Sequence, residues 1–216
     1  MIANLLLPFK EPKLWIFDLD GTLLDTKEAL DKVIQTILKE FNIPFDRETV
    51  DKYHSLGTFN LLRFLLKRHP KYEKKALFYA RELYKTDEYL GLLRTFDTMI
   101  DFVKEIKKKC PVAIATNRGK STTRILEHFG ISPLFDMVVH SDLTKNIKPH
   151  PEMLEKILKK FSLEPSLALF VGNDWPDLQA AVNAKIPTLI IQKNEHEKFK
   201  DVILKKGVKT FIKGML

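Results

Sequence analysis

From about residue 95 onward, short apolar runs alternate with amphipathic segments, and this alternation constrains the fold more than any other feature of the chain. Each apolar run has the composition of a buried strand, and the intervening segments repeat their apolar residues at helical spacing. The expected strands are residues 111–116, 135–140, 167–171 and 187–192, and the expected helices are 98–109, 121–129, 151–161, 176–184 and 195–206. Strands that alternate with helices indicate a parallel sheet with helices on both faces. We therefore predict a doubly wound, Rossmann-like α/β core.

One further strand is expected near the start of the chain, separated from the others by a helical block. Residues 13–18 contain an apolar run that ends at Asp18. Helical patterns then occupy residues 27–41, 47–54, 59–68 and 72–90, with no strand-like segment between them. We interpret residues 25–94 as an all-helical cap inserted into an α/β core that comprises residues 1–24 and 95–216.

Composition narrows the class of protein and its partners. The chain has 216 residues, enough for an α/β domain with a substantial core and a small accessory domain. We expect a cytoplasmic protein without a membrane partner, because no apolar run is long enough to span a bilayer and residues 1–8 lack the basic start of a signal peptide. The single cysteine, Cys110, excludes an intrachain disulfide and fits a reducing compartment.

The charge of the chain favours anionic ligands. A formal net charge of +8 attracts anions, among them phosphate esters. The lysines are spread along the chain, with no arginine-rich tract and no basic and aromatic motif of a nucleic-acid module. We therefore expect a small phosphorylated partner and do not expect nucleic-acid binding as the main function.

The stretch Asp18-Leu19-Asp20-Gly21-Thr22 carries the strongest functional signal. Residues i and i+2 of a strand point the same way, so Asp18 and Asp20 can be aimed at one place where the first strand ends. Two adjacent carboxylates repel each other unless a cation or a chemical task compensates. Magnesium binds carboxylate and phosphate oxygens together, one aspartate can attack phosphorus, and the other can protonate the leaving oxygen. The alternative is structural, because Asp-Gly-Thr also ends strands and begins helices.

Ligands of doubly wound sheets bind at the carboxyl ends of the strands, and two further expected strands lead into polar residues. Thr116 and Asn117 follow the strand 111–116, where a hydroxyl and backbone amides can hold phosphate oxygens. Lys148 follows the strand 135–140 in a segment that two prolines stiffen, so the place of its ammonium is restricted. The structural alternatives are a simple turn for Thr116-Asn117 and a solvated loop lysine for Lys148.

The strand 167–171 leads into Gly172-Asn173-Asp174-Trp175-Pro176-Asp177, where acidic groups gather again. These groups can complete a magnesium site. Asp174 can instead cap the N-terminus of the next helix, which is a common role for aspartate. Both interpretations can hold for different residues of this segment.

In this order, the four strand ends resemble the motifs of the haloacid-dehalogenase-like superfamily of hydrolases. Asp18-x-Asp20-Gly21-Thr22 matches the first motif, and Thr116, Lys148 and Gly172-Asn173-Asp174-x-x-Asp177 match the second, third and fourth. The inserted helical block resembles the subfamily that includes phosphoglycolate phosphatases and β-phosphoglucomutases. The presence of Asp20 argues against a dehalogenase, because the dehalogenase pattern lacks that second aspartate.

The resemblance implies a role for each matching residue. Asp18 would be the nucleophile that forms an aspartyl-phosphate, and Asp20 the general acid and then the base that activates water. Thr116 and Lys148 would bind the phosphoryl group. Magnesium would be held by Asp18, the Asp20 backbone carbonyl and an acidic group of the fourth motif.

Four further residues are expected to bind substrate because they belong to these motifs or adjoin them, namely Gly21, Thr22, Asn117 and Arg118. Arg118 can pair with a substrate carboxylate, which would suit phosphoglycolate. The alternative for Arg118 is an exposed arginine that leads into a helix.

The fourth motif departs from the family pattern, which has Gly-Asp where this chain has Gly172-Asn173. An asparagine can offer a carbonyl oxygen to magnesium but brings no charge. Either Asn173 is a neutral ligand, or Asp174 takes the ligand role with Asp177 in support. We favour Asp174.

The sequence therefore predicts a magnesium-dependent phosphatase that hydrolyses a small phosphate monoester, with 2-phosphoglycolate as the best guess, in a monomer or homodimer. The cap is expected to close over the site and to set substrate choice. Two alternatives stay open. One is a phosphomutase of the β-phosphoglucomutase type, and the other is a non-catalytic module that binds anions.

Overall fold

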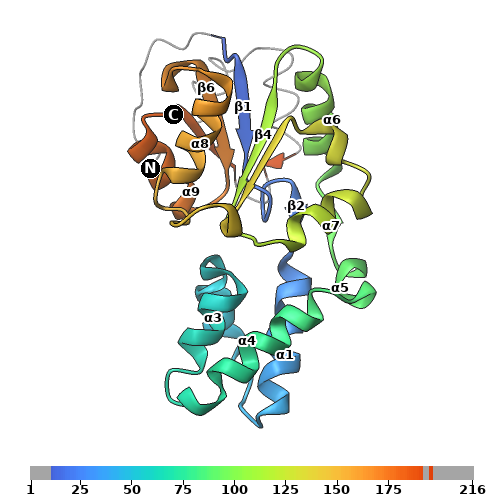
Figure 1. Ribbon diagram of the computed structural model, residues 1–216. Coiled ribbons are helices and arrows are strands. Elements are labelled where there is room, and N and C mark those ends of the chain that lie inside the picture. Colours follow the sequence, from blue (N-terminus) through green and yellow to red (C-terminus); the bar gives the residue numbers. More distant parts are fainter. Residues whose placement is uncertain (1–10, 192–194, 197–216) are drawn as a thin grey trace. The chain divides into compact units, whose positions relative to one another are not determined.

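Figure 1 shows a computed structural model of the chain, which describes residues 11–191 and 195–196. The chain divides into two compact units, one of Met1–Leu24 with Thr95–Leu216 and the other of Asp25–Arg94. Residues 197–206 of the helix expected over 195–206 lie outside the described residues. No helix among the described residues combines the length and the apolar character that crossing a membrane requires.

The first unit is built on a parallel sheet of five strands in the order β5-β4-β1-β6-β7. The strands are β1 (Leu14–Phe17), β4 (Val112–Thr116), β5 (Met137–His140), β6 (Ala168–Gly172) and β7 (Thr188–Ile190). Because β1 lies between β4 and β6, the chain changes sides of β1 after β5, and such a switch point is where α/β sheets bind ligands. The predicted doubly wound α/β fold is thus confirmed.

Helices cover both faces of this sheet (Figure 1). They are α6 (Asp97–Lys107), α7 (Ser121–His128), α8 (Glu152–Phe161) and α9 (Trp175–Ala184), with 3₁₀ turns η3 (Ser132–Leu134), η4 (Ser141–Leu143) and η5 (Pro165–Leu167). On one face, Ile157 of α8 and Ala181 of α9 join Ile16 of β1 in a buried cluster. On the other, Phe102 of α6 packs edge-on against Trp15, with ring centroids 5.1 Å apart. A strand buried on both faces must be apolar throughout, as β1 is.

The second unit consists of helices and the loops between them, with one strand residue at each end. It contains α1 (Lys27–Glu40), α2 (Arg47–Lys52), η1 (His54–Leu56), α3 (Gly57–Leu65), η2 (Pro70–Tyr72), α4 (Glu73–Leu83) and α5 (Asp87–Gly91). Its core is formed by fully buried side chains such as Ile34, Leu61 and Ala76. Where the chain passes between the units, β2 (Leu24–Asp25) pairs with β3 (Arg94–Thr95) in a sheet of two strands.

The continuous helix expected over residues 72–90 is wrong. The chain leaves α4 after Leu83 and begins α5 at Asp87. The hydroxyl of Thr86 accepts a hydrogen bond from the backbone N–H of Tyr89, so Thr86 caps a new helix. A threonine of this kind competes with the helical backbone for hydrogen bonds, which periodicity alone does not register.

Candidate active site

A tight loop follows β1 and presents the first group of polar residues. Asp18 continues the sheet, because its backbone N–H donates to the carbonyl of Val171 at 2.8 Å. Beyond it, the N–H of Gly21 donates to the carbonyl of Leu24 at 2.7 Å and closes the loop. Gly21 has a φ of 82°, and a Cβ there would collide with the side-chain amide of Asn173. Glycine is therefore required at this position by both conformation and contact.

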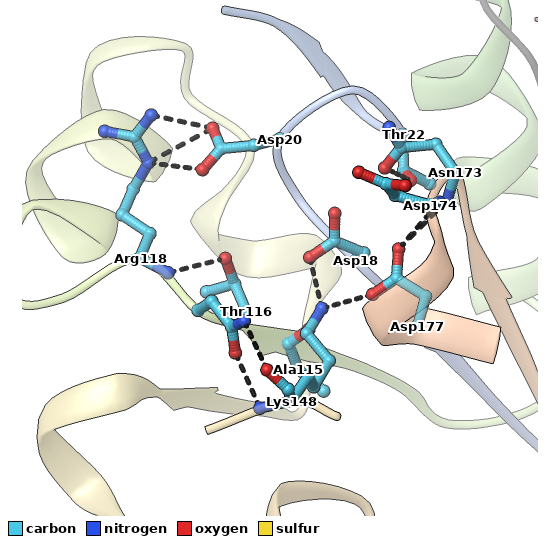
Figure 2. Close-up of polar contacts among 11 residues, drawn as sticks. Asp18, Asp20, Thr22, Ala115, Thr116, Arg118, Lys148, Asn173, Asp174 and Asp177 are labelled. Atoms are coloured by element: carbon cyan, nitrogen blue, oxygen red, sulfur yellow. Dashed lines mark hydrogen bonds and ion pairs between the residues drawn. The ribbon is translucent and has the colours of Figure 1, made fainter. Parts of the chain in front are cut away.

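Lys148 lies at the centre of a buried cluster of charges (Figure 2). Its Nζ donates to Oδ1 of Asp18 and to Oδ1 of Asp177, both at 2.6 Å, and to the carbonyl of Ala115 at 2.8 Å. The lysine side chain is only 2% exposed, and an ammonium has three donors, so all of them are used inside the protein. Lys148 thus connects the ends of β1 and β4 with helix α9.

Burial and charge shift the pKa values of this cluster. Burial raises the pKa of Asp18 to about 7 against the opposing charge of Lys148, and the carboxylates of Asp177 and Asp20 add to the rise. Burial alone would lower the pKa of Lys148, but Asp177 and Asp18 raise it above its usual value. One ammonium therefore serves two buried carboxylates, and Asp18 is the group whose charge is incompletely compensated.

Asn117 fixes the backbone of Lys148. Its Nδ2 donates to the carbonyl of Lys148 at 2.9 Å, and its Oδ1 accepts from the N–H of Lys148 at 2.8 Å. This pair of bonds is the one that a neighbouring strand would make. The side-chain amide of Asn117, expected to bind substrate, is thus engaged in positioning Lys148.

The last group of polar residues begins helix α9. Asp174 is the N-cap, and its Oδ1 accepts from the N–H of Trp175 at 2.6 Å. Asp177 completes a capping box, in which its Oδ2 accepts from the N–H groups of Asn173 at 3.0 Å and Asp174 at 3.2 Å. Since Oδ1 of Asp177 accepts from Lys148, both of its oxygens are bound to donors of the protein.

Gly172 makes room for this capping box, and Gly172→Ala is expected to disrupt it. A Cβ at Gly172 would lie 2.5 Å from Cβ and 2.6 Å from Cγ of Asp177, whose carboxylate cannot move without losing Lys148. Overpacking of this kind lowers the free energy of unfolding by roughly 1–3 kcal/mol, as a urea titration would measure. The control is Gly91→Ala, where the added Cβ meets nothing within 4 Å. Equal unfolding midpoints for the two variants would contradict the close packing argued for Gly172.

Asp20 and Arg118 form a bidentate ion pair (Figure 2). Nη2 of Arg118 donates to Oδ1 of Asp20 at 2.7 Å, and Nε donates to Oδ2 at 3.0 Å. The side chain of Arg118 is 8% exposed and that of Asp20 is 31% exposed. The backbone N–H of Arg118 also donates to Oγ1 of Thr116 at 3.1 Å. The alternative of an exposed arginine leading into a helix is therefore wrong, because the guanidinium is covered and holds Asp20.

Two further contacts hold the loop after β1. The hydroxyl of Thr22, a fully buried residue, donates to Oδ1 of Asn173 at 3.2 Å. Nε2 of the buried His196 lies 3.2 Å from the carbonyl oxygen of Gly21, and its ring stacks on Phe96 with centroids 3.9 Å apart. Sequence reasoning missed His196, since a single histidine far along the chain belongs to no motif.

The oxygen atoms around Asp18 fit a magnesium site in which few of the protein ligands carry a negative charge. Within the described part of the chain, no three acidic, histidine or cysteine side chains converge into a metal-binding group. Both oxygens of Asp177 are occupied, whereas only Oδ1 of Asp18 is bound to Lys148 and its other oxygen points away (Figure 2). The side-chain oxygens of the fourth motif lie in the loop after β6, where Oδ1 of Asn173 accepts from Thr22 and Oδ1 of Asp174 accepts from the N–H of Trp175. Magnesium accepts such oxygen ligands and usually retains water or phosphate as the others.

Comparison with known proteins relates the chain to one group of enzymes. A family model described as haloacid dehalogenase-like hydrolase matches residues 15–191. Pyrophosphatase PpaX of Bacillus cereus (strain G9842) is 30% identical over 179 residues, which cover 82% of this chain and 81% of the relative.

Solved structures give the same result. A protein described as a predicted phosphoglycolate phosphatase from Haemophilus somnus is 26% identical with a TM-score of 0.73, covering 87% of this chain and 92% of that one. A haloacid-dehalogenase-superfamily hydrolase of subfamily IA from Geobacter sulfurreducens is 24% identical with a TM-score of 0.70, covering 89% and 96%. The range matched by the family model contains every candidate residue from Asp18 to Asp177.

Proposed function

The chain belongs to the haloacid dehalogenase-like hydrolases, and from that premise we propose that it is a magnesium-dependent phosphatase of a small phosphate monoester, with 2-phosphoglycolate as the first candidate. The resemblance drawn from the sequence motifs is confirmed by the family match. That the chain is a phosphatase follows from the family and from relatives named pyrophosphatase and phosphoglycolate phosphatase. We propose, in addition, the substrate, the metal and the roles of the individual residues.

The observation that carries the proposal is the buried cluster in which Lys148 holds Asp18 at the end of β1. A carboxylate in a dry site with an ammonium beside it can attack phosphorus while the ammonium offsets the charge of the arriving phosphate. A carboxylate that served only a turn would lie in water, where ionisation has no desolvation cost. The non-catalytic alternative has no comparable support, because Asp18, Asp20, Thr116 and Lys148 are all present.

In the proposed reaction, an oxygen of Asp18 bonds to phosphorus as the bond from phosphorus to the leaving oxygen breaks. Asp20 gives a proton to the leaving oxygen, and later takes one from the water that attacks the aspartyl-phosphate. That attack releases inorganic phosphate and regenerates Asp18. Thr116 and Lys148 bind the phosphoryl oxygens in both steps, which favours the charge that develops there.

Magnesium would be held by Asp18, by the backbone carbonyl of Asp20 and by oxygens of Asn173 and Asp174. When bound, it supplies positive charge between the anionic nucleophile and the anionic substrate. These proposed ligands include both Asn173 and Asp174 of the fourth motif. They do not include Asp177, because its carboxylate accepts three hydrogen bonds within the protein. Asn173 brings no charge to the set.

Asp18→Asn is expected to lower phosphate release on the order of 10⁴-fold or more, because an amide cannot form the aspartyl-phosphate. The measurement is release of inorganic phosphate from 2-phosphoglycolate, pyrophosphate and ethyl phosphate, with magnesium and with a chelator. The matched control is Asp46→Asn, the same chemical change at the N-cap of α2, where asparagine caps equally well. Wild-type turnover by folded Asp18→Asn protein would refute the mechanism. Transfer of the phosphoryl group to an added sugar phosphate instead of water would favour the mutase.

A further inference from the structure

We propose that Arg118 selects substrates whose leaving group carries a second negative charge, by exchanging the carboxylate of Asp20 for that charge. This inference rests on the proposed phosphatase function and names the substrate class of the same site. The class is phosphate esters or anhydrides with a carboxylate or a phosphoryl group close to the leaving oxygen.

The ion pair of Arg118 and Asp20 is bidentate. The guanidinium donates to both carboxylate oxygens, through Nη2 at 2.7 Å and through Nε at 3.0 Å. These two N–H donors can bind a pair of oxygens on any carboxylate or phosphate, so they are not specific for Asp20. A substrate anion can therefore take the same two donors.

The backbone of Arg118 is held in place by two hydrogen bonds. The backbone N–H of Arg118 donates to the hydroxyl of Thr116, and its carbonyl accepts from the N–H of Ser141 at 2.9 Å. Arg118 is thus anchored at the end of β4 beside a proposed phosphoryl-binding hydroxyl, while its side chain reaches the proposed acid. Whatever is attached to the leaving oxygen must pass close to Asp20, and hence close to Arg118.

The side chains of Arg118 and Asp20 differ in burial. The Arg118 side chain is 8% exposed, so removing the carboxylate of Asp20 with no anion in its place would be costly. Asp20 is 31% exposed and is the partner that an arriving ligand can reach. The carboxylate of Asp20 thus occupies the position that a substrate anion would take.

The exchange follows from what Asp20 must do. While both of its oxygens accept from Arg118, the carboxyl group is not directed at a leaving oxygen. A leaving group that carries its own anion compensates Arg118 at the moment when Asp20 turns away. A leaving group without charge offers Arg118 no anion in exchange for Asp20, so its reaction is slower.

The first test compares 2-phosphoglycolate with ethyl phosphate, the same two-carbon ester without the carboxylate. In Arg118→Gln protein, the ratio of kcat/KM for these two esters is expected to fall about 10- to 100-fold, mainly through a higher KM for 2-phosphoglycolate. Arg118→Lys should retain part of the preference, since a lysine keeps the charge without the pair of N–H donors. The matched control is Lys120→Gln, which removes a positive charge from an exposed residue of the same loop and should keep the wild-type ratio.

The second test measures the exchange by calorimetry with phosphonoacetate, which carries both negative groups and is not hydrolysed. Asp20→Asn should tighten its binding several-fold, because the amide competes weakly for Arg118. In an Arg118→Gln background the same substitution should tighten it much less, which gives a double-mutant coupling. Equal tightening in both backgrounds would mean that Asp20 acts through general charge repulsion, and would overturn the exchange.

The two proposals fail in different ways. If Arg118→Gln slows both esters by the same factor while ethyl phosphate hydrolysis still requires Asp18, the selection by Arg118 is wrong and the phosphatase mechanism stands. If the wild type hydrolyses neither ester nor pyrophosphate, both proposals are overturned.

Discussion

Replacement of Lys148 with methionine is expected to lower the free energy of unfolding by about 3–5 kcal/mol at pH 8 without magnesium. The substitution leaves the carboxylates of Asp18 and Asp177 buried without their shared ammonium, and it removes the donor to the carbonyl of Ala115. Methionine has a similar length and fills the same space, so the loss reports charge and hydrogen bonding more than a cavity. Phosphate release should be lost as well, since the proposed site needs this ammonium beside the phosphoryl group.

Urea unfolding, monitored by circular dichroism, measures this loss of stability. Two further variants serve as controls. Lys145→Met, at an exposed residue three positions earlier, should change stability by no more than about 0.5 kcal/mol. The double variant Lys148→Met with Asp177→Asn should recover part of the loss, because one unpaired charge is gone. Lys148→Met protein as stable as the wild type at pH 8 would show that the cluster does not depend on the ammonium.

Most of the fold could be predicted because its determinants are local. The apolar runs of β1, β4 and β6 are fully buried, and a strand that is buried on both faces is recognisable from composition alone. The carboxyl ends of parallel strands lie at one edge of the sheet, and Asp18 and Thr116 were expected at that edge because each ends an apolar run. The break between α4 and α5 was missed, because a single capping hydroxyl at Thr86 decided it.

The partners of the site residues could not be predicted in the same way. Asn117 and Lys148 are 31 positions apart, and Arg118 and Asp20 are 98 apart, so each contact depends on tertiary distances that no local pattern encodes. Proline restraint singled out Lys148 but did not say which carboxylates it would meet. The contact of His196 with Gly21 was missed for the same reason, since nothing in the sequence near a lone histidine specifies a carbonyl so far away.

In the magnesium-free protein, stability is expected to fall as the pH rises from about 4 to 7. Burial raises the pKa of Asp18 from 3.8 to about 7, so between these values the folded protein holds a proton that the unfolded chain has released. The stability that this proton provides is complete below pH 3.8 and is lost as the pH rises through 7. One pKa unit corresponds to about 1.4 kcal/mol, so the decline is of the order of a few kcal/mol. Urea titrations at several pH values, with a chelator, measure it.

Asp18→Asn isolates this contribution, because the amide at residue 18 does not titrate. The difference between the two unfolding free energies should grow in favour of Asp18→Asn from pH 4 to 8 and then level off. Parallel pH profiles for the two proteins would contradict a raised pKa at Asp18.

Magnesium should reverse the decline, since a metal ion binds the ionised form of Asp18 and its binding stabilises the folded state. Its affinity should therefore rise with pH up to about 7, as calorimetry would measure, and the stabilisation should be absent in Asp18→Asn. An affinity that does not change with pH would mean that the ion does not bind through Asp18. The single ammonium of Lys148 leaves negative charge on Asp18 uncompensated, and this lack of positive charge, which destabilises the site without metal, favours the binding of a cation there.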